Sequence, residues 1–151
     1  MAELVDSNTK KLKMDEIVKI AAQNTKSEYS FNQVYLSIMK ELTMQGSIVI
    51  QLGNTLFIIH RTEDPKIGYM RALNADTAQN YMTNSEQFAK ISYDKYNLDT
   101  IVSDYTDPTV SNIFAYVGRN KPADMGFKIQ KSKDGKTFRA IAKLGPPRGA
   151  Q

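Results

Sequence analysis

The stretch KIGYMRALNADTAQN, residues 66–80, has the residue types and spacing to raise the question of phosphate binding. It reads as a strand that runs directly into a helix, and a helix N-terminus offers backbone N–H groups and positive potential to an anion. However, the turn contains no glycine, because Gly68 lies in the strand part of the stretch. Asp76 would also place a negative charge beside a phosphate. We therefore expect a plain connection that is capped by Asp76 or Thr77.

Most other catalytic chemistries are excluded by composition. The chain has no cysteine, which rules out disulfides and thiolate catalysis, and its single histidine, His60, rules out a site built from several histidines. It also lacks a Walker loop, a serine nucleophile elbow and a spaced cluster of metal ligands. Candidates for a general base are the carboxylates of Glu28, Glu63 and Asp64, and nothing in the pattern singles one out.

Positive charge is concentrated in the C-terminal quarter. Residues 118–151 contain nine Lys or Arg and two Asp, whereas residues 1–117 contain eleven basic and fourteen acidic residues. Such asymmetry can mark a surface for nucleic acid or an acidic protein, and it can equally mark a solvated hairpin face. Phe127, Phe138 and Tyr105 could stack on bases, although the two phenylalanines also suit a core. The candidate surface comprises Lys128, Lys131, Lys133, Lys136, Arg139, Lys143 and Arg148.

Hydrophobic periodicity and turn residues define the elements that would position these groups. The pattern predicts helices over residues 14–22, 31–42, 76–96 (with a break near Asn84) and 107–118, and strands over residues 47–52, 55–60, 66–72, 98–103, 125–131 and 136–144. Both arms of the hairpin around Gly53 and Asn54 are apolar, which predicts that both of its faces are covered. We expect one domain over residues 14–144, a flexible N-terminal arm over residues 1–13 and an extended tail over residues 145–151.

This order of elements resembles the Gcn5-related N-acetyltransferase (GNAT) fold over about residues 14–144. The C-terminal third, with YDKYNLDTIV, TVSNIFAYVGR and MGF in that order, resembles short acetyltransferase-like proteins of tailed bacteriophages. The resemblance implies an α+β fold with a mixed, mainly antiparallel central sheet, helices on both of its faces and a C-terminal β-hairpin.

The GNAT resemblance also implies positions for a cofactor and a catalyst. The family holds the cofactor pyrophosphate in a glycine-containing loop after a strand, which would place Arg71, Ala72, Asn74 and Ala75 at a degenerate form of that loop. The family's general acid is a tyrosine late in the last helix, a location that Tyr116 matches. The spacing from Tyr116 to the MGF motif is longer than is usual in the family.

Three functions follow from these observations. The glycine-free turn and the basic tail favour a non-catalytic structural or assembly protein of a phage particle, without a cofactor, that contacts other phage proteins or copies of itself. The alternative is an acetyl-CoA-dependent N-acetyltransferase with a divergent cofactor loop, and the second alternative is nucleic-acid binding through the basic hairpin. No segment resembles a signal peptide or a membrane span, so we expect a location in the virion or host cytoplasm and no membrane partner.

Overall fold

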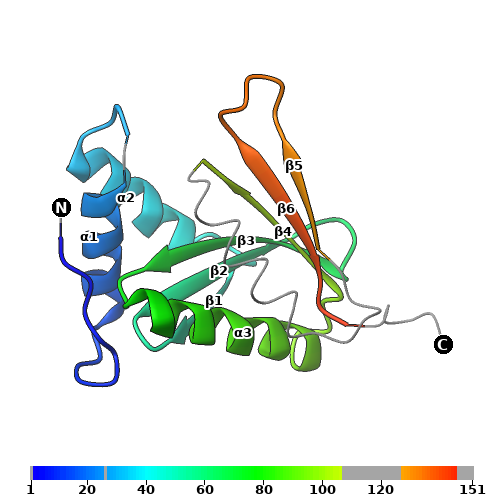
Figure 1. Ribbon diagram of the computed structural model, residues 1–151, viewed down its shortest axis with the longest axis horizontal. Coiled ribbons are helices and arrows are strands. Elements are labelled where there is room, and N and C mark those ends of the chain that lie inside the picture. The colour runs from blue at the N-terminus through cyan, green and yellow to red at the C-terminus, as the bar shows by residue number, and fades with distance from the viewer. Residues whose placement is uncertain (1, 26, 107–126, 146–151) are drawn as a thin grey trace. The chain divides into compact units, whose positions relative to one another are not determined.

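The computed structural model describes residues 2–25, 27–106 and 127–145. Its elements, shown in Figure 1, are α1 (Met14–Asn24), α2 (Phe31–Leu42), β1 (Ile48–Leu52), β2 (Thr55–Arg61), β3 (Ile67–Asn74), α3 (Ala78–Asp94), β4 (Thr100–Tyr105), β5 (Phe127–Lys131) and β6 (Phe138–Lys143). The predicted helix over residues 107–118 and most of the predicted tail lie outside the described residues. The other elements agree with the predicted order.

The strands form one six-stranded sheet in the order β1-β2-β3-β4-β6-β5. β6 is antiparallel to both β4 and β5, whereas β3 and β4 are parallel and pair through Ile67 with Thr100, Gly68 with Ile101 and Tyr69 with Val102. This mixed sheet with its three described helices confirms the predicted α+β class. The parallel pairing covers only three residues of each strand, although β3 continues to Asn74 and β4 to Tyr105.

The chain divides into two compact units. One contains residues 1–58 and 72–84, and the other contains residues 59–71 and 85–151. The first unit therefore holds α1, α2, the N-terminal arm and the turn before α3. The second holds β4, the β5–β6 hairpin and the loop between β2 and β3.

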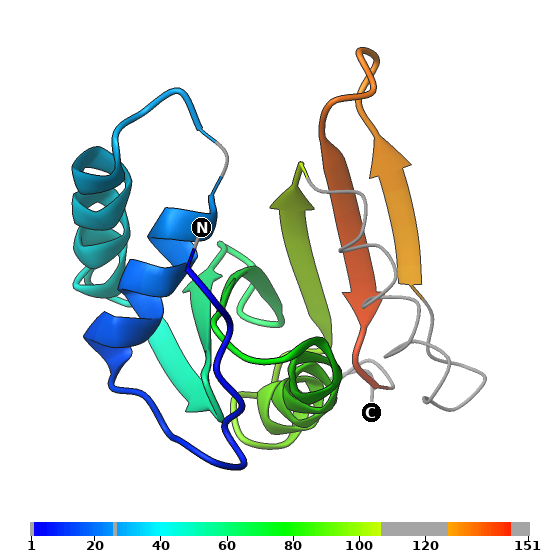
Figure 2. The same cartoon turned by 60° about the vertical axis from the view of Figure 1, so that its left-hand side comes forward.

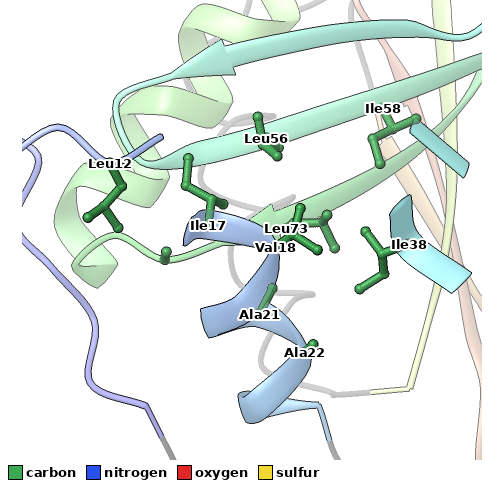
Figure 3. Packing of buried hydrophobic residues seen from close by; sticks show 10 residues of the cluster. Leu12, Ile17, Val18, Ala21, Ala22, Ile38, Leu56, Ile58 and Leu73 are labelled. Carbon is green, nitrogen blue, oxygen red and sulfur yellow. The ribbon is translucent and has the colours of Figure 1, made fainter. Parts of the chain in front are cut away.

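The core of the first unit is built from the apolar faces of α1 and α2 against β2 and β3 (Figure 3). Ile17 and Val18 of α1 and Ile38 of α2 are fully buried, as their three-four spacing predicts. Burying each of these side chains contributes about 1.5–3 kcal/mol to folding. Leu56, Ile58 and Leu73 complete this cluster from the strands.

Two local predictions about the first unit are settled by the structure. Ser30 and Gln33 form the predicted capping box of α2, in which the Gln33 backbone N–H donates to the Ser30 hydroxyl and the Ser30 N–H donates to the Gln33 side chain. The prediction that both hairpin arms are covered is wrong for β1, whose apolar residues are half-buried. Of the two hairpin arms, β1 is an edge strand, whereas β2 has a neighbouring strand on each side.

The second unit is organised around β4, β6 and β5, which lie side by side in Figure 2. Gly68 marks the close approach that its position in a strand predicts. A Cβ atom at Gly68 would lie 2.7 Å from Cγ2 of Ile59 and 3.1 Å from Cδ1 of Leu98. This packing leaves room only for glycine on that face of β3.

The predicted break of the third helix near Asn84 is wrong, because α3 runs without interruption from Ala78 to Asp94. Asn84 is buried, and its side-chain amide donates a hydrogen bond to the hydroxyl of Thr55 at 3.1 Å. Asparagine disfavours a helix interior mainly because its side chain competes for backbone groups. Here the side chain has tertiary partners instead.

Candidate functional site: the turn before α3

The turn that joins β3 to α3 is centred on the buried carboxylate of Asp76. Its Oδ1 accepts hydrogen bonds from the backbone N–H of Ser7 at 3.1 Å, the backbone N–H of Thr77 at 2.9 Å and the side-chain amide of Asn80 at 3.0 Å. Its Oδ2 accepts from the backbone N–H of Asn54 at 3.0 Å and the side-chain amide of Asn84 at 3.3 Å. A carboxylate with this many donors is stable as an anion without a cationic partner.

The hydrogen bonds determine the charge state of this carboxylate. Burial alone raises the pKa of Asp76, but the hydrogen bonds from Ser7, Asn54 and Asn80 outweigh that effect and lower the pKa from 3.8 to about 2. Asp76 is therefore ionised at neutral pH. It holds a full negative charge within two residues of the first residue of α3.

Four backbone donors of the turn already have partners inside the protein. The Ala75 N–H donates to the Asn54 carbonyl at 3.0 Å, and the Asp76 N–H donates to the Asn74 side chain at 3.0 Å. The Thr77 N–H donates to the Asp76 carboxylate at 2.9 Å, and the Asn80 N–H donates to the Thr77 hydroxyl at 3.4 Å. Thr77, rather than Asp76, therefore supplies the helix cap. These four are among the groups that a phosphate-binding turn would offer to its ligand.

The N-terminal arm covers this turn. The Val5 N–H donates to the Ala75 carbonyl at 2.8 Å, and the Asn80 amide donates to the Asp6 carboxylate at 2.9 Å. Asn8 donates through its side chain to Asn80 at 3.3 Å. The arm thus brings a second carboxylate, that of Asp6, to the start of α3.

Asn54 in the β1–β2 turn anchors the same arm. Its side-chain oxygen accepts from the Leu12 N–H at 2.8 Å, and its amide donates to the carbonyls of Val5 at 3.2 Å and Lys10 at 2.9 Å. Sequence reasoning took Asn54 only as a hairpin signal and missed this role. No local pattern reports it, because the partners lie more than forty residues away in sequence.

Gly53 of the β1–β2 turn lies directly against the Asp76 carboxylate. It adopts a φ of 55°, and a Cβ atom there would lie 2.8 Å from Oδ2 of Asp76, 2.9 Å from the Asn84 amide and 2.9 Å from the Ser7 hydroxyl. Glycine is therefore required for both its backbone conformation and its lack of a side chain. The hairpin turn, the arm and the turn before α3 form one packed cluster within the first unit, which we call the Asp76 cluster.

The predicted cofactor residues do not form a phosphate cradle. Ala75 is buried, and the Asn74 side chain is used within the turn, where it accepts from the Asp76 N–H and from the Thr55 hydroxyl at 3.0 Å. Arg71 is exposed and Ala72 is half-buried. With four of its backbone donors occupied and an ionised carboxylate at its centre, this turn does not fit a pyrophosphate.

The other candidate catalytic residues are not gathered into a site by the part of the chain that the structure describes. Glu63 and Asp64 lie in the exposed β2–β3 loop, where Asp64 accepts from the Lys66 N–H at 2.9 Å as a turn residue. Glu28 is exposed in the loop between α1 and α2. Tyr116, the candidate general acid, and Arg148 lie outside the described residues.

The basic hairpin is only partly free to contact an anionic partner. Arg139 donates two hydrogen bonds to Asp104, at 2.8 and 3.0 Å, and these bonds lower the pKa of the Asp104 carboxyl. The Arg139 guanidinium also lies 5.8 Å from the Tyr69 ring centre. Tyr105 and Phe138 stack on each other with ring centres 5.4 Å apart. Lys131 lies over the Phe138 ring, and Lys143 donates to the Thr100 hydroxyl at 3.4 Å, whereas Lys128, Lys133 and Lys136 are exposed.

A hollow lies where α1 ends and α2 begins, and aromatic side chains contribute to it. Tyr29 and Phe31 are exposed large side chains. The hollow is lined by Ala22, Gln23, Thr25, Tyr29, Phe31 and Val34.

Among the described residues, no group of three or more histidine, cysteine or acidic side chains could hold a metal ion. No helix in the described segments is long and apolar enough to cross a membrane.

Three solved structures with related folds are all acetyltransferases. A dodecameric spermidine N-acetyltransferase of Vibrio cholerae has a TM-score of 0.55 at 10% identity, covering 94% of this chain and 92% of its own. A GNAT-family acetyltransferase of Bacillus anthracis has a TM-score of 0.56 at 8% identity, covering 89% and 93%. The N-acetyltransferase PseH of Campylobacter jejuni has a TM-score of 0.54 at 13% identity, with the same coverage.

No protein-family model matches the sequence, and neither does any curated protein. The structural comparison nevertheless confirms the GNAT-like fold that the order of elements implied. It corrects the functional expectation of a non-catalytic phage structural protein. That expectation rested on the glycine-free turn and the basic tail, whereas these three proteins of similar fold are acetyltransferases.

Proposed function

We propose that this protein is an N-acetyltransferase, which transfers an acetyl group from a thioester sulfur to an amine nitrogen. The observation that carries the proposal is its GNAT-like fold, which aligns with N-acetyltransferases over about nine-tenths of both chains. The resemblance implies acetyl-CoA as the donor. Because the turn before α3 does not fit a pyrophosphate, no step of the reaction is assigned to that turn.

The parallel pair β3–β4 offers a place for an extended donor. The pairing ends at Tyr69 with Val102, and both strands continue beyond it. The groups that the parallel register would use next are the Met70 carbonyl and the Asp104 N–H, and they can hydrogen-bond to an extended amide-bearing chain in the way that a sheet edge binds a peptide. A thioester donor whose arm contains amide groups can form such hydrogen bonds.

The hollow between α1 and α2 supports an amine as the acceptor. Tyr29 and Phe31 offer aromatic rings at its surface, and protonated amines are attracted to the faces of such rings. The similar enzyme of Vibrio cholerae is a spermidine N-acetyltransferase. We therefore include polyamines, together with amino sugars and peptide N-termini, among the acceptors to be tested.

The test is acetyl transfer from acetyl-CoA and from S-acetylpantetheine to this panel of amines, with products identified by mass spectrometry. We expect one amine class to give product, and Phe31→Ala to raise the KM for that amine severalfold. Leu36→Ala is the matched control, because Leu36 is an exposed apolar residue of α2 that does not line the hollow. Absence of product with every amine and both donors would refute the proposed function.

A further inference from the structure

The turn before α3 contains an anion that belongs to the protein itself. Asp76 is fully buried and accepts hydrogen bonds from two neighbouring segments as well as from its own turn. A helix N-terminus attracts one anion, and here that position is filled by a carboxylate of the chain. A second anion at the same place would meet repulsion in a poorly solvated environment.

A diphosphate at this turn would also compete with bonds inside the protein for four backbone donors. The N–H groups of Ala75, Asp76, Thr77 and Asn80 all donate within the protein. Releasing them would leave the partners of those bonds without donors in a buried site, which costs about 1–3 kcal/mol for each unsatisfied group. The carboxylate of Asp6, which accepts from the Asn80 side chain, would add further negative charge.

We propose that this protein recognises an acyl donor without using a diphosphate, so that its donor class is a thioester on a pantetheine-like arm rather than one defined by a nucleotide. The inference deepens the proposed function and rests on it. In the reaction, the amine nitrogen forms a bond to the acyl carbon and the carbon–sulfur bond breaks. The proton lost by the amine balances the proton gained by the departing thiol.

The experiment compares two donors that differ only in the nucleotide part. S-acetylpantetheine and acetyl-CoA are assayed with the acceptor found in the amine panel, and 3′,5′-ADP is tested as an inhibitor. We expect kcat/KM for the two donors to agree within about threefold, and millimolar 3′,5′-ADP to leave the rate unchanged. A preference of a hundredfold or more for acetyl-CoA, with competitive inhibition by 3′,5′-ADP, would overturn the inference and leave the proposed function standing.

Asp76→Asn tests the cause of this donor choice. The substitution removes the charge with little change of shape, so we expect the ratio of kcat/KM for acetyl-CoA to that for S-acetylpantetheine to rise at least threefold. A ratio of two donors on one variant is insensitive to a general loss of folded protein, which lowers both rates equally. Asp134→Asn is the matched control in a turn of the other unit, and its ratio should equal that of the wild type.

The outcomes separate the two hypotheses. Transfer from neither donor refutes the proposed function, and the inference falls with it. Transfer from acetyl-CoA alone refutes only the inference. An unchanged donor ratio in Asp76→Asn would show that the Asp76 carboxylate does not exclude the diphosphate, which removes the basis of the inference even if both donors react.

Discussion

The turn before α3 and the turn of the β5–β6 hairpin are both built around an aspartate, yet they differ in what the aspartate connects. Asp134 accepts from the Lys136 N–H at 3.0 Å and from the Ser132 hydroxyl, and both partners lie two residues away. Asp76 accepts from Asn54 and Ser7, which lie 22 and 69 residues away in sequence. The first carboxylate is exposed, whereas the second is fully buried.

This difference shows how one chemical group can serve a local or a tertiary purpose. Water can replace the hydrogen-bond donors of an exposed turn aspartate, so these hydrogen bonds add little to the free energy of unfolding. A buried aspartate that joins segments distant in sequence leaves several donors unsatisfied when it is removed. The Asp76 cluster should therefore respond strongly to substitution, and the β5–β6 hairpin weakly.

The largest expected effect follows from Asp76→Ala. This substitution leaves the five donors to Asp76 without their acceptor, and we expect the free energy of unfolding to fall by about 3–5 kcal/mol. Urea denaturation monitored by circular dichroism measures this change. Asp134→Ala is the control, and an equal loss in both variants would contradict the distinction between the two turns.

Gly53→Ala should have the next largest effect. A Cβ atom at this position meets polar atoms of Asp76, Asn84 and Ser7 within 2.9 Å, and the residue has a positive φ. We expect a loss of about 2–3 kcal/mol in thermal or urea unfolding. Gly135→Ala provides the comparison, because Gly135 also has a positive φ of 74° but its nearest neighbour is the flexible Lys131 side chain at 3.2 Å. It should lose only about 1 kcal/mol.

The pH dependence of stability should reveal the Asp76 carboxylate. Its pKa is about 2 in the folded protein and 3.8 in the reference state, so folding is favoured by the ionised form. This contribution, on the order of 2 kcal/mol, is fully present above about pH 4 and is lost as the pH falls towards 2. Urea unfolding across this pH range should show a flatter profile for Asp76→Asn than for the wild type. A profile unchanged by the substitution would contradict the assignment.

The smallest effect is expected for the ion pair of the hairpin region. Arg139 and Asp104 form a bidentate pair whose side chains are 45% and 56% exposed. A double-mutant cycle with Asp104→Ala and Arg139→Ala should give a coupling below about 1 kcal/mol that weakens with added salt. A coupling as large as the loss in Asp76→Ala would reverse the ranking of the two regions.

Local patterns in the sequence were sufficient for most of the fold. The three-four spacing of α2 together with Ser30 and Gln33 determined that helix and its start, and Gly53-Asn54 between apolar runs determined the first hairpin. The order of elements implied the GNAT-like fold. The absence of glycine from residues 71–80 also predicted, from chemistry alone, that this turn is a poor phosphate cradle.

Only the tertiary structure decided what occupies that turn instead. Asp76 could be read from the sequence as a cap or as an obstacle, but its partners Ser7 and Asn54 approach it only once the arm and the hairpin have folded together. Likewise, α3 continues through Asn84 because the Asn84 side-chain amide donates hydrogen bonds to Thr55 and Asp76 rather than competing for backbone groups. Side chains of this kind form hydrogen bonds with residues that are distant in sequence, and no local pattern records such partners. The role of Asp76 in the turn is therefore determined by the packing of the arm and the hairpin around it.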